Sequence, residues 1–254
     1  MNARTLYDFL EGEIPSSLSE DWDNDGIMCC PDPAREVKKV LIALDITERV
    51  ADYAIAGGFD VIVSHHPMVF YKLGGIDPTL NTSRKLIKLI KNGISAFSFH
   101  TRLDALCGGV NDVLAEILGM KNAKPFGPAG DEIGRIGDIE SKSVEDFCLT
   151  LREKLGAPFI NCAPCGESVS RLAVLGGDGK DFVAAARAAG ADTFVSGQFN
   201  YNIMVEARET GMTLIEAGHF FTEDPVCGFV RTLIARADES IMTEKIISNE
   251  LKVY

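Results

Sequence analysis

The sequence lacks any long apolar run. No uninterrupted stretch approaches the roughly 18 apolar residues of a membrane-spanning helix, and the chain opens with Met1-Asn2-Ala3-Arg4 in place of a signal peptide. Hydrophobic residues make up 46% of the chain and charged residues 24%, ordinary proportions that exclude a disordered or fibrous class. We therefore expect a cytoplasmic protein that has no contact with a membrane.

Positive charge is also scarce. The chain carries 25 Lys and Arg against 37 Asp and Glu, which gives a formal net charge of −12. Such a charge repels phosphate backbones at long range, so nucleic acid is not an expected partner. A small anionic substrate would need a local positive feature, and a bound metal ion would supply one.

The cysteines show no paired framework. There are seven, an odd number, as is typical of reduced thiols in a cytosol. The segment Cys162-Ala-Pro-Cys165 is a lone C-x-x-C without the second pair that a structural zinc site needs. Neither a disulfide scaffold nor a zinc ribbon is predicted.

Strand and helix patterns alternate along both halves of the chain. Short apolar runs precede amphipathic or Ala-rich patterns that often end at glycine. The first half predicts strands at 40–44, 60–64 and 94–99 and helices at 48–56, 83–91 and 110–118. The second half predicts strands at 172–175, 193–196 and 213–217 and helices at 182–189, 201–209 and 226–237. A connector at 121–168 carries a helical stretch at 144–155 and a possible strand at 158–161.

The two halves also share details. Both second strands follow a Gly-x-Asp step, at 58–60 and 190–192, and both third strands end at a histidine followed four residues later by an acid. These details favour a duplication, although α/β chains in general resemble themselves at this level. We predict an α/β fold of two duplicated βαβαβα units, with mostly parallel sheets flanked by helices. The first unit is predicted over residues 1–125, with an N-terminal helix, and the second over 126–254, with the connector.

All four histidines follow predicted strands. His65 and His66 follow the second strand of the first half, and His100 and His219 follow the third strands. Ligands of parallel α/β sheets bind beyond the carboxyl ends of the strands. A lone histidine in such a place is more often a hydrogen-bonded structural residue. Here all four histidines follow strands, and each has an acid or another histidine nearby, which indicates a metal site.

The donor types predict two divalent metal ions. The predicted ligands are His65, His66, Asp104, His219 and Glu223. Imidazole with carboxylate suits Zn, Fe or Mn, and two such ions lower the pKa of a shared water. Glu223 has a longer reach than Asp104 and is the predicted bridge. His100 is a fifth imidazole ligand, an orienting residue or a general acid/base, and we favour the last two roles. His100 and Glu223 are thus the predicted catalytic residues.

Weaker signals concern substrate binding. Gly177 and Gly179 lie in a turn between a strand and a helix, where their N–H groups could cradle a phosphate or simply form a tight turn. Gln198, at the strand end that mirrors His65, could contact substrate or cap the next helix. The acidic segment 21–26 resembles the start of a calcium loop but has no Glu at the twelfth position, so we interpret it as an Asx-rich turn.

Four segments of the chain resemble the signature blocks of the NIF-three-like family, whose bacterial members are named GTP cyclohydrolase 1 type 2 homologues. The segments are Trp22-Asp23-Asn24-Asp25-Gly26, Ser64-His65-His66-Pro67, His100-Thr101-Arg102-Leu103-Asp104 and Gly218-His219-Phe220-Phe221-Thr222-Glu223. The resemblance covers essentially the whole chain. It implies a duplicated α/β unit, a dinuclear metal centre and a homohexamer built as a trimer of dimers.

By position, the resemblance implies that His66 and Asp104 hold one ion, that His65 and His219 hold the other, and that Glu223 bridges them. His100 then becomes a neighbour of the site. The chain departs from the family pattern at two positions, Gln198 and Asn202, where many relatives carry an acid and a histidine.

Three functions follow from this site. We expect a metal-dependent hydrolase acting on a nucleotide-like small molecule; for GTP, the family name implies opening of the imidazole ring and release of formate. A non-enzymatic metal-binding regulatory scaffold is the alternative that residues 198 and 202 favour. A metal-dependent phosphoesterase would use the same two-ion chemistry on another substrate.

Overall fold

The computed structural model describes residues 1–253, and the chain forms two compact units. The first comprises residues 1–103 and 227–252, and the second is built on residues 104–226. The chain therefore leaves the first unit after Leu103 and re-enters it at Cys227, and its last helix and strand belong to the first unit. The predicted halves, 1–125 and 126–254, describe a duplication in the sequence, and that division stays a prediction.

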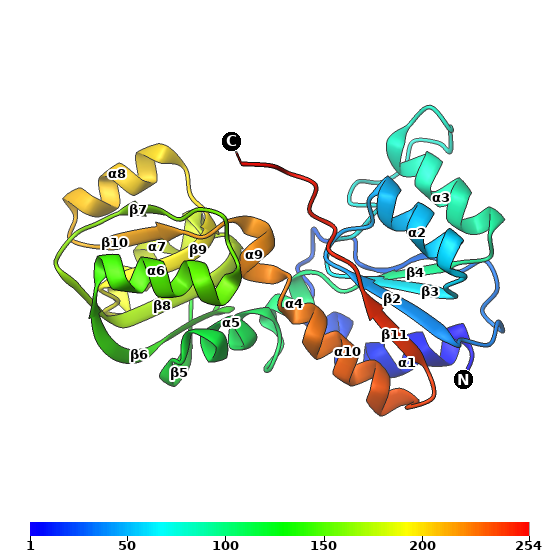
Figure 1. Cartoon of the computed structure of the whole chain (residues 1–254), viewed down its shortest axis with the longest axis horizontal. Helices are drawn as coiled ribbons and strands as arrows, with labels where there is room; N and C mark the ends of the chain where they lie inside the picture. Colours follow the sequence, from blue (N-terminus) through cyan, green and yellow to red (C-terminus); the bar gives the residue numbers. More distant parts are fainter. Residues whose placement is uncertain (254) are drawn as a thin grey trace. The chain divides into compact units, whose positions relative to one another are not determined.

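The first unit is a sheet with helices on both faces. Its strands are β1 (Gly26–Cys29), β2 (Lys39–Ala43), β3 (Val61–Ser64), β4 (Ser95–Ser98) and β11 (Met242–Lys245). Its helices are α1 (Ala3–Glu13), η1 (Ser16–Leu18), α2 (Glu48–Gly57), α3 (Asn81–Lys91) and α10 (Val226–Ala237), and α4 (Thr101–Ala105) spans the first crossing. The strand order is β1-β4-β3-β2-β11, parallel except for β1. Helices α2 and α3 cover one face of this sheet, and α1 and α10 lie at the other (Figure 1).

The parallel register decides where the polar loops of the first unit emerge. Ala43 pairs with Ser64, and Ser64 pairs with Ser98, so β2, β3 and β4 end at one level. Thr47 caps the start of helix α2 with its hydroxyl, which accepts from the Val50 N–H at 3.2 Å, and the helix buries an apolar stripe on the sheet. Side chains that directly follow the three strands therefore share one edge of the sheet.

The second unit contains a mixed sheet. Its strands are β5 (Lys121–Phe126), β6 (Gly134–Ser143), β7 (Asn161–Ala163), β8 (Ser168–Asp178), β9 (Thr193–Gln198) and β10 (Thr213–Glu216). Its helices are α5 (Val110–Leu118), α6 (Val144–Leu155), η2 (Lys180–Phe182), α7 (Val183–Ala188), α8 (Tyr201–Glu209) and α9 (His219–Glu223). The order is β5-β6-β8-β9-β10-β7, in which β8, β9 and β10 are parallel and the other pairings are antiparallel.

The predicted α/β class, with two sheets flanked by helices, is confirmed. Each unit has three consecutive parallel strands at its centre, as the repeated pattern predicts. The connector is more ordered than expected: besides β7, which lies next to the predicted strand at 158–161, it adds β5 and β6, and all three strands pair antiparallel in the second sheet. The second sheet is therefore less parallel than the first.

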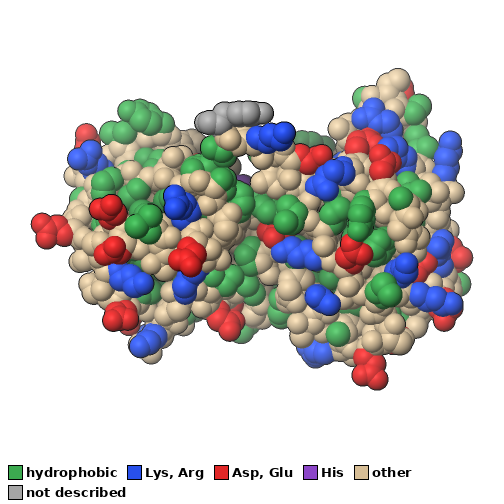
Figure 2. Space-filling model, in the orientation of Figure 1, with side chains coloured by type: hydrophobic (Ala, Val, Ile, Leu, Met, Phe, Trp, Pro, Cys, Tyr) green, Lys and Arg blue, Asp and Glu red, His purple; other side chains and the backbone are tan. Residues whose placement is uncertain are grey.

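Two surface properties bear on partners. Figure 2 shows Lys and Arg side chains interspersed with Asp and Glu on the face that it presents. Within residues 1–253, no helix combines the length and the apolar character needed to cross a membrane.

Candidate metal centre

Three of the four histidines gather at the carboxyl edge of the first sheet. His65 and His66 follow β3, and His100 follows β4. Their ring centroids are 5.0 Å apart for His65 and His66, 5.2 Å for His65 and His100, and 5.6 Å for His66 and His100. Each ring offers a nitrogen within 4.8 Å of the other two, a spacing at which the group could hold a metal ion.

An acceptor oxygen lies against Nδ1 of each of these rings. The partners are the Phe99 carbonyl for His65 at 3.0 Å, Asp45 Oδ1 for His66 at 2.7 Å, and Asp23 Oδ1 for His100 at 3.0 Å. A carbonyl or an ionised carboxylate only accepts hydrogen bonds. Each Nδ1 therefore carries a proton, and in the neutral imidazole Nε2 carries the lone pair. This arrangement is typical of metal-binding histidines, so the donor set fits a divalent ion.

The acidic turn at residues 21–26 holds the loop that carries His100. Asp23 Oδ2 accepts from the Thr101 hydroxyl at 2.7 Å, and Asp25 Oδ2 accepts from the His100 N–H at 3.1 Å. Burial raises the pKa of the Asp23 carboxyl, but hydrogen bonds from His100 and Thr101 exceed that effect and hold the pKa well below its usual range. The turn predicted from the sequence is thus an anchor for the histidine cluster.

The second unit presents His219 and Glu223 from one short helix. In α9, His219 Nε2 lies 3.1 Å from Glu223 Oε2, because residues four apart share a helix face. Gly218 precedes the helix with a φ of 86°, and a β-carbon there would lie 2.8 Å from the Phe221 ring. Glycine is therefore required for the chain to enter α9 in this direction.

The glycine turn after β8 packs against Glu223. Gly177 has a φ of 70°, and a β-carbon at this position would lie 2.3 Å from Glu223 Oε1. The Gly177 N–H donates to the Thr222 hydroxyl at 3.2 Å. A β-carbon on Gly179 would likewise meet the Ser196 side chain at 2.6 Å. The turn makes room for a carboxylate, and the phosphate-binding role of Gly177 and Gly179 stays a prediction.

Asn111 links Asp104 to the same turn. Its side chain donates from Nδ2 to the Asp104 carbonyl at 3.1 Å and accepts at Oδ1 from the Gly176 N–H at 2.8 Å. Asn111 is fully buried near the start of α5. Within the second unit, hydrogen bonds therefore link the Asp104 backbone to the glycine turn that packs against Glu223.

Sequence reasoning missed Asp45 and Asn111. Asp45 stands just past β2, so the rule that located the histidines, polar residues after parallel strands, also applied to it. Asn111 is a polar residue on the buried face of a helix, which was the available signal for it.

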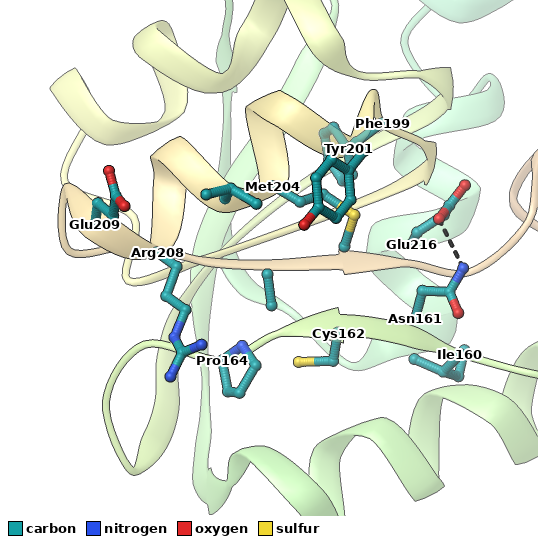
Figure 3. A pocket seen from close by; sticks show the side chains of 12 residues that line it. Ile160, Asn161, Cys162, Pro164, Phe199, Tyr201, Met204, Arg208, Glu209 and Glu216 are labelled. Carbon is teal, nitrogen blue, oxygen red and sulfur yellow. Dashed lines mark hydrogen bonds between the residues drawn. The ribbon is translucent and has the colours of Figure 1, made fainter.

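Among the cavities of the described residues, one lies along α8 and another beside His66. A cavity of about 930 Å³ runs along α8 in the second unit. Figure 3 shows Tyr201, Met204 and Arg208 of α8 facing Cys162 and Pro164 across it. The predicted substrate residues at positions 177, 179 and 198 are not part of its lining. In the first unit, a cavity of about 410 Å³ lies beside His66.

Comparison with known proteins gives consistent matches over the full length. A sequence model of Duf34/NIF3 (NGG1p interacting factor 3) matches residues 1–251. A GTP cyclohydrolase 1 type 2 homolog of Clostridium perfringens is 33% identical over 259 residues, covering 99% of this chain and 98% of that protein.

Solved structures show the same architecture. The reduced HcgD of Methanocaldococcus jannaschii is similar with a TM-score of 0.81 and 28% identity, over 96% of this chain and 97% of that one. A Bacillus cereus protein related to NIF3 has the same fold, with a TM-score of 0.90 and 21% identity over 100% of this chain and 99% of that one.

Proposed function

The chain belongs to the Duf34/NIF3 family, and from that premise we propose that it is a hydrolase that uses two divalent metal ions to act on a nucleotide-like small molecule. The proposed ions are Zn, Fe or Mn, and the proposed ligands are His65, His66, Asp104, His219 and Glu223. The observation that carries the proposal is the histidine cluster of the first unit, in which an acceptor oxygen fixes every Nδ1.

We propose that the five ligands are divided between two ions. The family resemblance supports His66 with Asp104 at one ion, His65 with His219 at the other, and Glu223 as the bridge.

The metal ions and His100 would have different roles in the proposed reaction. A bound pair of divalent ions supplies an activated water and stabilises negative charge at the attacked centre. The lone pair on Nε2 of His100 would accept a proton and return it, because Asp23 engages Nδ1 and fixes the ring. The name of the Clostridium perfringens relative, GTP cyclohydrolase 1 type 2 homolog, supports GTP as the proposed substrate. The specific reaction that we propose is opening of the imidazole ring with release of formate.

The proposal extends to assembly and location. The family resemblance supports a homohexamer, a trimer of dimers, in the cytoplasm. Light scattering of the purified full chain tests the assembly: a mass near that of a monomer or dimer contradicts the hexamer.

Elemental analysis of freshly purified protein tests the metal site. We expect about two ions per chain, and a loss of metal after either His66→Ala or His219→Ala, since both are proposed ligands. If only one of these substitutions removes metal, the proposed ligand set is wrong. If the wild-type chain binds none, the proposal fails.

A nucleotide screen with the metal-loaded protein tests the activity. We expect turnover, with formate as a product from GTP, and loss of turnover in His100→Gln while the metal stays bound. Release of inorganic phosphate in place of formate would identify a phosphoesterase. Absence of turnover in a protein that holds its metal would contradict the hydrolase and favour the regulatory scaffold.

A further inference from the structure

The C-terminal segment of the chain approaches the histidine cluster. Beyond β11, the Ile246 N–H donates to the Ile42 carbonyl at 3.0 Å, so the segment continues along β2. Arg49 of α2 pairs with Glu250 at 3.2 Å and holds the segment further on. Between these two contacts Ser248 is 2% exposed, at the carboxyl end of β2.

Ser248 makes two hydrogen bonds to Asp45. Its hydroxyl donates to Asp45 Oδ2 at 2.8 Å and accepts from the Asp45 N–H at 3.2 Å. The other carboxylate oxygen, Oδ1, lies 2.7 Å from His66 Nδ1. A serine hydroxyl has one hydrogen to donate, and here the carboxylate takes it. The rotation of the Asp45 carboxylate is therefore set from a residue 203 positions away in the sequence.

We propose that Ser248 is a positioning residue of the metal centre, acting through Asp45 on the imidazole of His66. The inference rests on the proposed metal-binding function. Asp45 is 40% exposed at its side chain, so without the serine hydroxyl the carboxylate can turn toward water. The ring of His66 then loses the acceptor that keeps Nε2 as the metal-binding nitrogen.

A competing cation strengthens the argument. Lys85 lines the same cavity as Asp45 and His66, and its ammonium donates to the Ile46 carbonyl at 2.7 Å. Glu48 in that cavity is already paired with Lys88 at 2.6 Å. A released Asp45 carboxylate therefore has the Lys85 ammonium to approach in place of the His66 imidazole. Ser248 keeps the carboxylate on the side of the imidazole.

The test compares zinc affinities of full-length variants by competition with a chromogenic chelator. Loss of a partner of this kind lowers metal affinity about 10- to 100-fold, and we expect that loss in Ser248→Ala. Ser248→Thr keeps the hydroxyl and should stay within about threefold of the wild type. Ser240→Ala is the matched control, because its hydroxyl donates to the remote Asp238 at 2.6 Å; its affinity should not change.

A double-mutant cycle separates positioning from a general structural role. If Ser248 acts through Asp45, Ser248→Ala combined with Asp45→Asn should bind zinc as weakly as Asp45→Asn alone. Losses that multiply overturn the inference, and so does a Ser248→Ala protein with wild-type affinity. Should Ser248→Ala fail to fold, Ser248→Cys retains most of the volume with a weak donor and should show the same loss.

The tautomer of His66 gives a readout that needs no metal. Imidazole ¹⁵N chemical shifts of the metal-free chain should report Nδ1–H in the wild type and a mixture of tautomers in Ser248→Ala. Unchanged shifts contradict the positioning role. If the wild type takes up no zinc while the shifts change as expected, the proposed function fails and the link from Ser248 to His66 stands.

Discussion

Replacement of Arg102 by methionine should strongly destabilise the first unit. Arg102 is 2% exposed, and its guanidinium donates from Nε and Nη2 to Asp25 at 2.8 and 2.7 Å. Its Nη1 donates to Glu11 at 2.6 Å and to the Ile14 carbonyl at 2.9 Å. Methionine fills much of the space but leaves two carboxylates without their cation.

The magnitude follows from the burial of the two acids. Hydrogen bonds to charged groups each contribute about 1.5–3 kcal/mol. A simple sum over the three carboxylate contacts overstates the loss of stability, because one of the two acids can be solvated once the arginine is gone. The Glu11 side chain is 29% exposed and regains water, whereas that of Asp25 is 5% exposed and does not. Removal of one partner of a buried ion pair typically costs about 3–5 kcal/mol. We expect that loss in the free energy of unfolding.

Urea denaturation followed by tryptophan fluorescence measures this loss. Trp22 is the only tryptophan and belongs to the first unit, so its emission reports on that unit. The control is Arg4→Met, which removes the ion pair between Arg4 and Asp8. Both of these side chains are more than half exposed, so the free energy of unfolding should fall by less than about 1 kcal/mol. Equal losses in the two variants would refute the idea that the buried cluster stabilises the unit.

Three further perturbations test the same structural reasoning. Gly177→Ala should lower metal content and the thermal midpoint of unfolding, because its β-carbon meets a candidate ligand carboxylate. The control is Gly190→Ala, which also has a positive φ (87°) but open space around it, and it should keep its metal. Equal metal loss in both variants contradicts the steric explanation. Burial raises the pKa of Glu11, but hydrogen bonds from Ser16 and Arg102 lower it from 4.5 to about 2. This carboxylate therefore stabilises the fold above about pH 4.5, and its contribution is lost as the pH falls toward 2. The difference in unfolding free energy between wild type and Arg102→Met, measured by urea denaturation, should therefore become smaller over that range. Zinc at about 100 times its dissociation constant should add about 2.7 kcal/mol to the free energy of unfolding, and a chelator should remove that gain in a thermal melt; an unchanged melt argues against a site in the folded state.

Local sequence signals located most of the central elements. The predicted helices at 110–118, 144–155, 201–209 and 226–237 have the bounds of α5, α6, α8 and α10. Glycines in the left-handed conformation end α5 and α6 just past their last residues, at Gly119 and Gly156. Strands β1, β5, β6 and β11 were not predicted. Edge strands such as β1, β5 and β11 are defined by pairing with a neighbour and carry little apolar pattern. Strand β6 lies inside the sheet, but glycines and charged residues interrupt its apolar pattern.

The rule that ligands bind beyond the carboxyl ends of parallel strands predicts part of the site. It identified the loops of His65, His66 and His100, which the first unit brings together. It also identified His219 and Glu223, which are close to each other on α9. The five metal ligands themselves stay a prediction until metal content is measured.

The sequence by itself determined the α/β class, the parallel strands and the loops that carry imidazoles and carboxylates. These depend on periodicity and on turn residues within a few positions of one another. Only the tertiary structure decided which acceptors fix the rings, such as Asp45 on His66 and Asp23 on His100. Ser248 and Asp45 are 203 positions apart in the sequence. Their hydrogen bond depends on the pairing of β11 with β2, which no local sequence pattern predicts.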